Sequence, residues 1–135
     1  MYETEKWLVY EQQDFEADVE DLAKRLSNGA QMPLFKRFDG IYGIPAGGNV
    51  LATYLHYRLK LPLLAAPTRN SLVVDDIVDS GKTIAHYIEK GNFCVALFYN
   101  RQSSWEPNIW LHEKIDKWIH FPWEAPEDGD DRLAR

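Results

Sequence analysis

The densest group of reactive side chains lies in residues 72–83, which read LVVDDIVDSGKT. An apolar run delivers the adjacent carboxylates of Asp75 and Asp76, and a polar glycine-containing turn follows. If a helix begins at this turn, the backbone N–H groups of residues 80–83 face outward, where a phosphate gains hydrogen bonds and the positive end of the helix dipole. Gly81 allows close backbone approach and a positive φ, while paired carboxylates can hold two ribose hydroxyls or a hydrated Mg²⁺. The segment therefore predicts a site for a phosphorylated sugar.

The segment allows two other interpretations. The letters GKT at residues 81–83 also end a nucleoside triphosphate P-loop, but that motif needs a glycine where this chain has Asp76. Asp79 would also repel a triphosphate wrapped in the loop. The second interpretation is an ordinary acidic loop in which Asp79 or Ser80 caps the following helix. We favour the phosphorylated-sugar site over both.

Two units of strand, glycine turn and helix position this chemistry. The first has an apolar strand at residues 40–44 and the turn PAGG at residues 45–48, followed by a helix with one apolar face. The second has a strand at residues 72–74, a turn at residues 75–81, and a helix that Gly91 ends. Both turns would lie at the carboxyl ends of their strands, where ligands bind in sheets of this kind.

The elements around these units favour an α/β fold. Residues 93–99 form another continuous apolar strand, and residues 6–10 form a short one. A first helix follows residues 6–10, with Asp14 as its expected N-cap and residues 28–29 as its stop. The apolar face of that helix contains Phe15, Val19, Leu22, Ala23 and Leu26. Apolar strands that alternate with helices indicate a mainly parallel, Rossmann-like sheet covered on both faces.

The last third of the chain has no helical periodicity. Residues 108–111 and 117–121 read as short extended pieces, which we expect to form a cap over the sheet. Residues 126–135, PEDGDDRLAR, contain almost no apolar side chain and predict a mobile acidic tail. We therefore expect one domain over residues 1–125.

Composition excludes several classes of function. The 135 residues have a net charge of −6, which argues against general nucleic-acid binding. No apolar run has the length of a membrane span, and the start lacks the layout of a signal peptide, so we expect a cytoplasmic protein. The single cysteine, Cys94, lies in an apolar strand and predicts a buried structural thiol. The four histidines lack the spacing of metal ligands.

Three segments together resemble type I phosphoribosyltransferases. VVDDIVDSGKT at residues 73–83 looks like the family's signature for 5-phosphoribosyl 1-pyrophosphate (PRPP). IPAGG at residues 44–48 is similar to its pyrophosphate loop. KWIHFPWE at residues 117–124 looks like the base-binding segment of compact xanthine and hypoxanthine-guanine enzymes.

The resemblance implies a role for each matching residue. Asp75 and Asp76 would contact the ribose hydroxyls and, through water, the Mg²⁺ cofactor, while Asp79 would serve as the catalytic base beside the purine. Trp118 would stack on the purine, with Ile119 and Asn100 near its exocyclic groups. The 5-phosphate would bind Ser80, Gly81, Lys82 and Thr83, and the pyrophosphate would lie against Ala46, Gly47 and Gly48.

The chain departs from the family pattern at three places. Only residues 61–71 separate the second helix from the signature strand, so the mobile hood of the family is short or missing, with Arg69 as its one possible cation. Ala46 stands where a basic side chain is common. Asn100 stands where a lysine reads the 6-oxo group. We leave open whether Arg101 meets a phosphate or only a surface acid.

The resemblance implies an Mg²⁺-dependent enzyme that transfers the phosphoribosyl group from PRPP to a nucleobase and releases pyrophosphate. The expected acceptor is a 6-oxopurine, namely hypoxanthine, guanine or xanthine, in purine salvage, and the expected assembly is a homodimer or larger homo-oligomer. One alternative is a nucleotide or PRPP sensor of the same fold with little or no catalysis. Another is an enzyme of this fold that acts on a pyrimidine or an unusual base. We assign Trp110 and Trp123 to packing rather than to base binding.

Overall fold

A computed structural model describes residues 1–28 and 33–125. The predicted tail at residues 126–135 and the helix stop at Gly29 lie outside these residues. The elements in chain order are β1 (Tyr2–Glu3), β2 (Trp7–Val9), α1 (Gln12–Ser27), the 3₁₀ helix η1 (Leu34–Arg37), β3 (Ile41–Gly43), α2 (Gly47–Leu59), β4 (Leu72–Val78), α3 (Lys82–Glu89), β5 (Phe93–Tyr99), β6 (Ile109–Glu113) and β7 (Trp118–His120).

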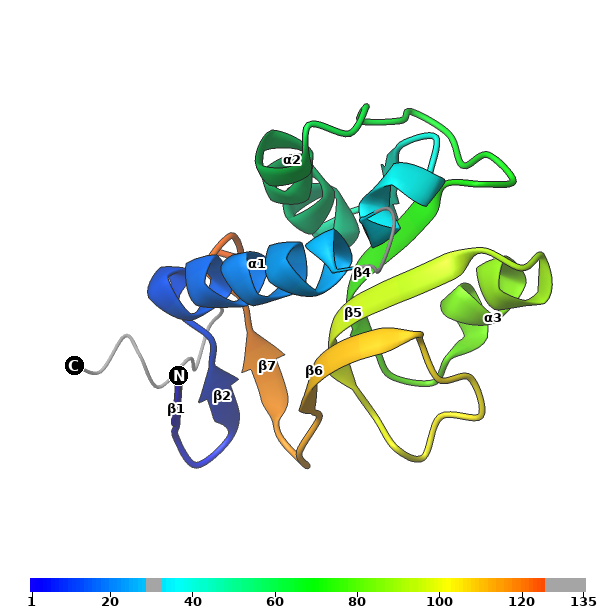
Figure 1. Cartoon of the computed structure of the whole chain (residues 1–135). Coiled ribbons are helices and arrows are strands. Elements are labelled where there is room, and N and C mark those ends of the chain that lie inside the picture. Colours follow the sequence, from blue (N-terminus) through cyan, green and yellow to red (C-terminus); the bar gives the residue numbers. More distant parts are fainter. Residues whose placement is uncertain (29–32, 126–135) are drawn as a thin grey trace.

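The main sheet has four strands in the order β3-β4-β5-β6, and all of its pairs are parallel. Helices α1 and α2 lie on one side of it and α3 on the other (Figure 1). Along β4, Leu72 and Val74 belong to the core formed with α1 and α2, whereas Val73 belongs to the cluster that contains Ile84 of α3. The predicted α/β sheet, covered on both faces, is confirmed.

The predicted cap is only partly correct. β6 does not lie over the sheet but extends it, because β5 is apolar on both faces and its open edge needs a partner. Asn108 fastens this edge, since its backbone N–H donates to Cys94 O and its side-chain oxygen accepts from Cys94 N, both at 2.8 Å. A second, small sheet has the order β1-β2-β7, with Trp7 opposite Trp118 in a parallel pair.

Two local expectations also need correction. β4 continues to Val78, so the turn after it begins only at Asp79. The N-cap of α1 is Glu11, and Asp14 is the third helical residue, whose carboxylate accepts from the Glu11 backbone N–H at 2.9 Å. Within residues 61–71, only Leu63 forms a strand-like bridge, to Ile41.

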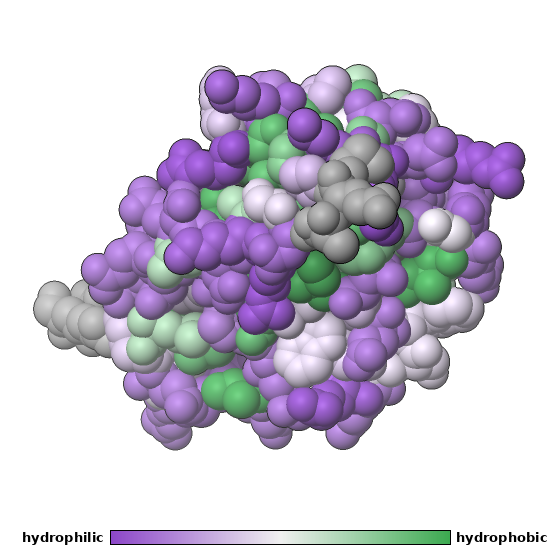
Figure 2. Space-filling model, viewed as in Figure 1, coloured by the Kyte–Doolittle hydropathy of each residue, from purple (hydrophilic) through white to green (hydrophobic). Residues whose placement is uncertain are grey.

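The interior agrees with the predicted apolar faces. Phe15, Val19, Leu22 and Leu26 of α1 are buried, and so is Cys94, whose thiol pKa burial raises to about 12. The view of Figure 2 shows a mostly hydrophilic surface with small, separate hydrophobic patches. Among the described residues, no helix has the length and apolar character required to cross a membrane.

Candidate functional site

The carboxyl ends of β3, β4 and β5 bring most of the predicted site residues to one edge of the main sheet. Val78 at the end of β4 pairs with Tyr99 at the end of β5, so the next residues of both strands are neighbours. The Asn100 side chain donates from Nδ2 to Asp79 Oδ1 at 2.9 Å, and its backbone N–H donates to Val78 O at 2.9 Å. Asn100 therefore holds the exposed carboxylate of Asp79 in place.

A small cavity of about 140 Å³ follows β4, of the size that one phosphate group needs. Gly81 closes it with a φ of +85° immediately before α3 begins at Lys82. A Cβ at Gly81 would lie 2.2 Å from Ser103 Oγ, so the segment after β5 supports the turn from behind and only glycine fits. The cavity is lined by Asp75, Ile77, Val78, Asp79, Ser80, Gly81, Thr83 and Ile84.

The adjacent carboxylates of β4 face different parts of the site, because successive residues of a strand point to opposite faces of the sheet. Asp75 lines the phosphate-sized cavity, while Asp76 contacts Gly47, where an added Cβ would lie 1.9 Å from Asp76 Oδ2. Burial, followed by the neighbouring Asp76 carboxylate, raises the pKa of Asp75 to about 8. Asp75 therefore needs a cation or a nearby donor before its charged form becomes favourable near neutral pH.

The glycine turn before α2 lies against β4. Gly48 approaches so closely that an added Cβ would lie 2.6 Å from Val74 O. The peptide bond between Pro45 and Ala46 is cis, and Ala46 is the exposed N-cap residue of α2. This turn therefore offers backbone groups and the start of a helix to an anion, but no basic side chain.

The carboxylates suit Mg²⁺ better than a transition metal. Within residues 1–28 and 33–125, no three His, Cys, Asp or Glu side chains gather as a metal cage. Mg²⁺ commonly binds through one or two carboxylates together with water and substrate phosphates. The oxygen donors of Asp75 and Asp76, beside the cavity after β4 and the glycine turn before α2, fit that pattern.

A second hollow, of about 360 Å³, lies on the other side of Asp79. Trp118 forms one wall, and its side chain is 73% exposed although it belongs to a strand. The preceding Lys117 is held by Glu3 at 3.0 Å and by Thr4 O at 2.6 Å. Ile119 is half-buried in β7. The hollow is lined by Glu5, Lys6, Asp79, Lys114, Asp116, Lys117 and Trp118.

Sequence reasoning missed the contribution of the amino-terminal hairpin to this hollow. Glu5 and Lys6 reach it because β2 pairs with β7. Lys114 reaches it because its backbone N–H donates to Tyr99 O at 2.8 Å, which fixes the end of β6 beside the end of β5. No local pattern signals these contacts, since each depends on pairing between distant segments.

Some candidate residues lie elsewhere. Arg69 precedes β4 and lies at the amino end of the sheet, so the expected hood cation is not at the site. Arg101 forms an ion pair with Glu113 at 3.0 Å and lies 5.1 Å from the centre of the Trp110 ring, so it meets a surface acid rather than the cavity. Trp123 packs on the ring of Phe121 at 4.9 Å, as expected for a packing residue.

Sequence comparison alone identifies no relative, since neither a family model nor a curated protein matches the chain. Solved structures do match. A purine phosphoribosyltransferase from Pyrococcus horikoshii Ot3 is 22% identical, with a TM-score of 0.72 over 90% of this chain and 96% of its own. A xanthine-guanine-hypoxanthine phosphoribosyltransferase from Helicobacter pylori is 19% identical, with a TM-score of 0.74 over 96% and 99%. A hypothetical protein from Neisseria gonorrhoeae with bound ppGpp is 19% identical, with a TM-score of 0.68 over 98% of both chains.

These matches span nearly the full length of both partners, and the sheet that they cover in this chain has four parallel strands. The chain therefore has the fold of compact purine phosphoribosyltransferases.

Proposed function

We propose that this protein is an Mg²⁺-dependent phosphoribosyltransferase that transfers the 5-phosphoribosyl group from PRPP to a 6-oxopurine and releases pyrophosphate. The observation that carries the proposal is the position of Asp79, which lines both the phosphate-sized cavity and the Trp118 hollow. A sugar phosphate held in the first and a ring held in the second would meet at this carboxylate. The proposed setting is purine salvage in the cytoplasm.

The chemistry suits these groups. Departure of pyrophosphate leaves positive charge on the anomeric carbon, which the carboxylates of Asp75, Asp76 and Asp79 would stabilise. Mg²⁺, when bound at Asp75 and Asp76, would neutralise charge on the leaving pyrophosphate. Asp79 would accept the proton that the purine nitrogen loses, with Asn100 holding the carboxylate at 2.9 Å. Fixing both reactants in one geometry would supply much of the acceleration.

The direct test is incubation of the full chain with PRPP, Mg²⁺ and one base at a time, with nucleotide detected by chromatography. Hypoxanthine, guanine or xanthine should give product, and adenine, uracil and orotate should give less. Absence of nucleotide from every base would overturn the proposal. Product only from a pyrimidine would keep the transfer reaction but overturn the choice of acceptor.

The role of Asp79 needs its own variant. Asp79→Asn should lower kcat by a factor of about 10²–10⁴, the usual contribution of a general base. Affinity for ribose 5-phosphate should change little, because the cavity keeps its backbone donors. Asp21→Asn removes the same charge from the surface of α1 and should leave both quantities unchanged. Equal losses of kcat and ribose 5-phosphate affinity in Asp79→Asn would contradict the assignment.

A nucleotide sensor of the same fold is the second candidate. Two features favour it: Ala46 offers no cation to pyrophosphate, and the loop with Arg69 lies away from the site. The structural neighbour from Neisseria gonorrhoeae that holds ppGpp shows that a protein of this fold can bind a nucleotide. Tight nucleotide binding by calorimetry without any transfer would favour the sensor, whereas a turnover of about 1–10 per second would exclude it.

A further inference from the structure

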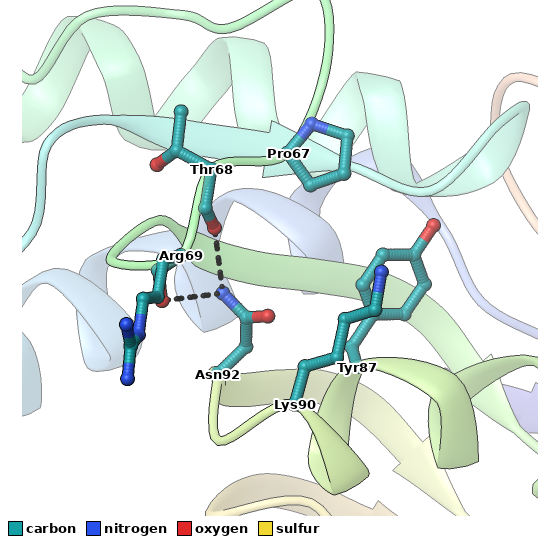
Figure 3. A pocket seen from close by; sticks show the side chains of 6 residues that line it. All are labelled: Pro67, Thr68, Arg69, Tyr87, Lys90 and Asn92. Carbon is teal, nitrogen blue, oxygen red and sulfur yellow. Dashed lines mark hydrogen bonds between the residues drawn. The ribbon is translucent and has the colours of Figure 1, made fainter.

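Another hollow, of about 400 Å³, lies at the opposite edge of the main sheet (Figure 3). It is formed by the loop before β4, the end of α3 and the residue that precedes β5. β4 has seven residues, which places the two edges roughly 20 Å apart. The hollow is therefore separate from the site at the carboxyl ends. Its lining residues are Pro67, Thr68, Arg69, Tyr87, Lys90 and Asn92.

The wall of this hollow is held in place by a buried amide. Asn92 is only 7% exposed, and its Nδ2 donates to Thr68 O and Ser71 O at 3.0 Å, with Arg69 O at 3.4 Å. Ser71 adds a hydroxyl that donates to Thr68 O at 2.9 Å and accepts from Thr68 N at 3.1 Å. The loop is thus fixed to the start of β5, and the hollow exists without a ligand.

The side chains that line the hollow carry a positive charge, and one acid lies beside them, since the Asp39 carboxylate accepts from the Thr68 hydroxyl at 3.0 Å. Arg69 and Lys90 are exposed, and the ion pairs of the described residues include neither of them. No acidic residue lines the hollow, although the chain as a whole has a net charge of −6. Figure 3 shows Lys90 beside the ring of Tyr87 on one side of Asn92, and Arg69 on the other side. Cations at both ends of the hollow suit an anionic ligand.

The hollow also offers flat apolar surfaces. The rings of Tyr87 and Pro67 stand on the same side of Asn92 as Lys90, and the Asn92 side-chain oxygen points toward them (Figure 3). Burial and a hydrogen bond with Tyr42 raise the pKa of the Tyr87 hydroxyl, so the ring stays neutral beside an anion. A planar ring can stack on such a side chain while a cation holds its charged group.

We propose that this hollow is a second binding site, for a small molecule that joins a planar ring to a phosphate or carboxylate group. The ring would lie against Tyr87 and Pro67, and the anionic group would bind Lys90, with Arg69 available to a second charge. The volume of about 400 Å³ lies within the usual range for small-molecule sites. The proposal does not depend on the phosphoribosyltransferase activity, because it uses none of the same residues.

The test is a titration of the ¹⁵N-labelled full chain with phenyl phosphate, followed residue by residue by NMR. The amide signals of residues 68–71 and 87–92 should shift and saturate. Signals of residues 80–83 report the phosphate loop separately, so failure of one site is distinguishable from failure of the other. Absence of saturable shifts at residues 68–71 and 87–92 would overturn the proposal.

Variants assign the effect to the two cations. Arg69→Ala/Lys90→Ala should raise the Kd for phenyl phosphate at this hollow at least about tenfold, since two charge-assisted contacts are lost. Lys24→Ala/Arg37→Ala removes the same two charges from exposed positions outside the hollow and should change this Kd less than about twofold. Shifts that persist unchanged in the first double variant would overturn the proposal. Equal affinity for inorganic phosphate and phenyl phosphate would overturn the part that concerns the ring.

Discussion

Replacing Gly81 by alanine tests whether the turn between β4 and α3 depends on the segment that follows β5. Gly81 has a φ of +85°, and an added Cβ would lie 2.2 Å from Ser103 Oγ. The Ser103 hydroxyl donates to Trp105 O and accepts from Trp105 N, both at 3.2 Å. Gly81→Ala must therefore adopt an unfavourable backbone conformation and also displace a hydroxyl that has two partners.

The size of the effect follows from these two contributions. A left-handed conformation costs a non-glycine residue about 1–2 kcal/mol. Loss of the two Ser103 hydrogen bonds costs about 1 kcal/mol each. Gly81→Ala should thus lower the free energy of unfolding by about 3 kcal/mol. It should also weaken phosphate binding, because the turn has to move.

Gly91 provides a matched control. Its φ is +87°, nearly the same as that of Gly81, but nothing lies within 4 Å of an added Cβ. Gly91→Ala therefore carries only the backbone cost, about 1–2 kcal/mol. The difference between the two variants isolates the contact with Ser103.

Urea unfolding of the unsubstituted chain, Gly81→Ala, Gly91→Ala, Ser103→Ala and Gly81→Ala/Ser103→Ala measures these quantities. Removal of the Ser103 hydroxyl should relieve the clash, so the double variant should be more stable than the two single effects predict, by at least about 1 kcal/mol. If Gly81→Ala is no less stable than Gly91→Ala, or if the effects of Gly81 and Ser103 simply add, the account of this turn is wrong.

Three further predictions concern the rest of the site. Trp118→Ala should raise the KM for the base about tenfold or more, because stacking is lost, but should change the free energy of unfolding by less than about 0.5 kcal/mol, because Trp118 is 73% exposed. Trp123→Ala should instead lower the free energy of unfolding in urea by about 3 kcal/mol, because its ring packs in the interior. The reverse pattern would exchange the roles of the two tryptophans. The folded protein holds the Asp75 proton more tightly than the unfolded chain does, because the pKa of Asp75 is about 8 when folded and about 4 when unfolded. The stability that this proton contributes is therefore full below a pH of about 4 and should be lost as the pH rises through about 8. Over the same range Mg²⁺ affinity, measured by calorimetry, should increase, and an Asp75→Asn variant that retains either pH dependence would contradict the assignment. Arg101→Ala should change ribose 5-phosphate affinity less than about twofold, because its guanidinium is engaged with Glu113; a large loss in a binding titration would place Arg101 at the phosphate.

The parts of the fold that the sequence predicted well are those with a strong local signal. Residues 93–99 form β5 as expected, since seven consecutive apolar or small residues suit a strand buried on both faces. The apolar spacing also predicted helix α1 correctly, and Gly91 correctly predicted the end of α3. The two glycine turns reach the same edge because parallel strands do so necessarily.

The parts that failed depend on where the chain travels in space. α2 returns the chain to the amino edge of the sheet, and Arg69 lies only three residues before β4 begins, a span of about 10 Å at most, which is too short to reach the other edge. Arg69 therefore cannot be placed at the site by its order in the sequence. The position of β6 was predicted wrongly because its five residues, half-buried except for the exposed Glu113, have no period that distinguishes an edge strand from a cap.

The parallel pair of β2 and β7 has a consequence for biosynthesis. Residues Trp7–Val9 emerge from the ribosome early, whereas their partners Trp118–His120 are among the last described residues to be made. The strands that frame the turn at Gly81 are complete earlier, so a nascent chain can form that half of the site before the Trp118 wall is made. Until synthesis passes β7, β2 is paired with β1 on one edge only, and its other edge is open to chaperones or other chains.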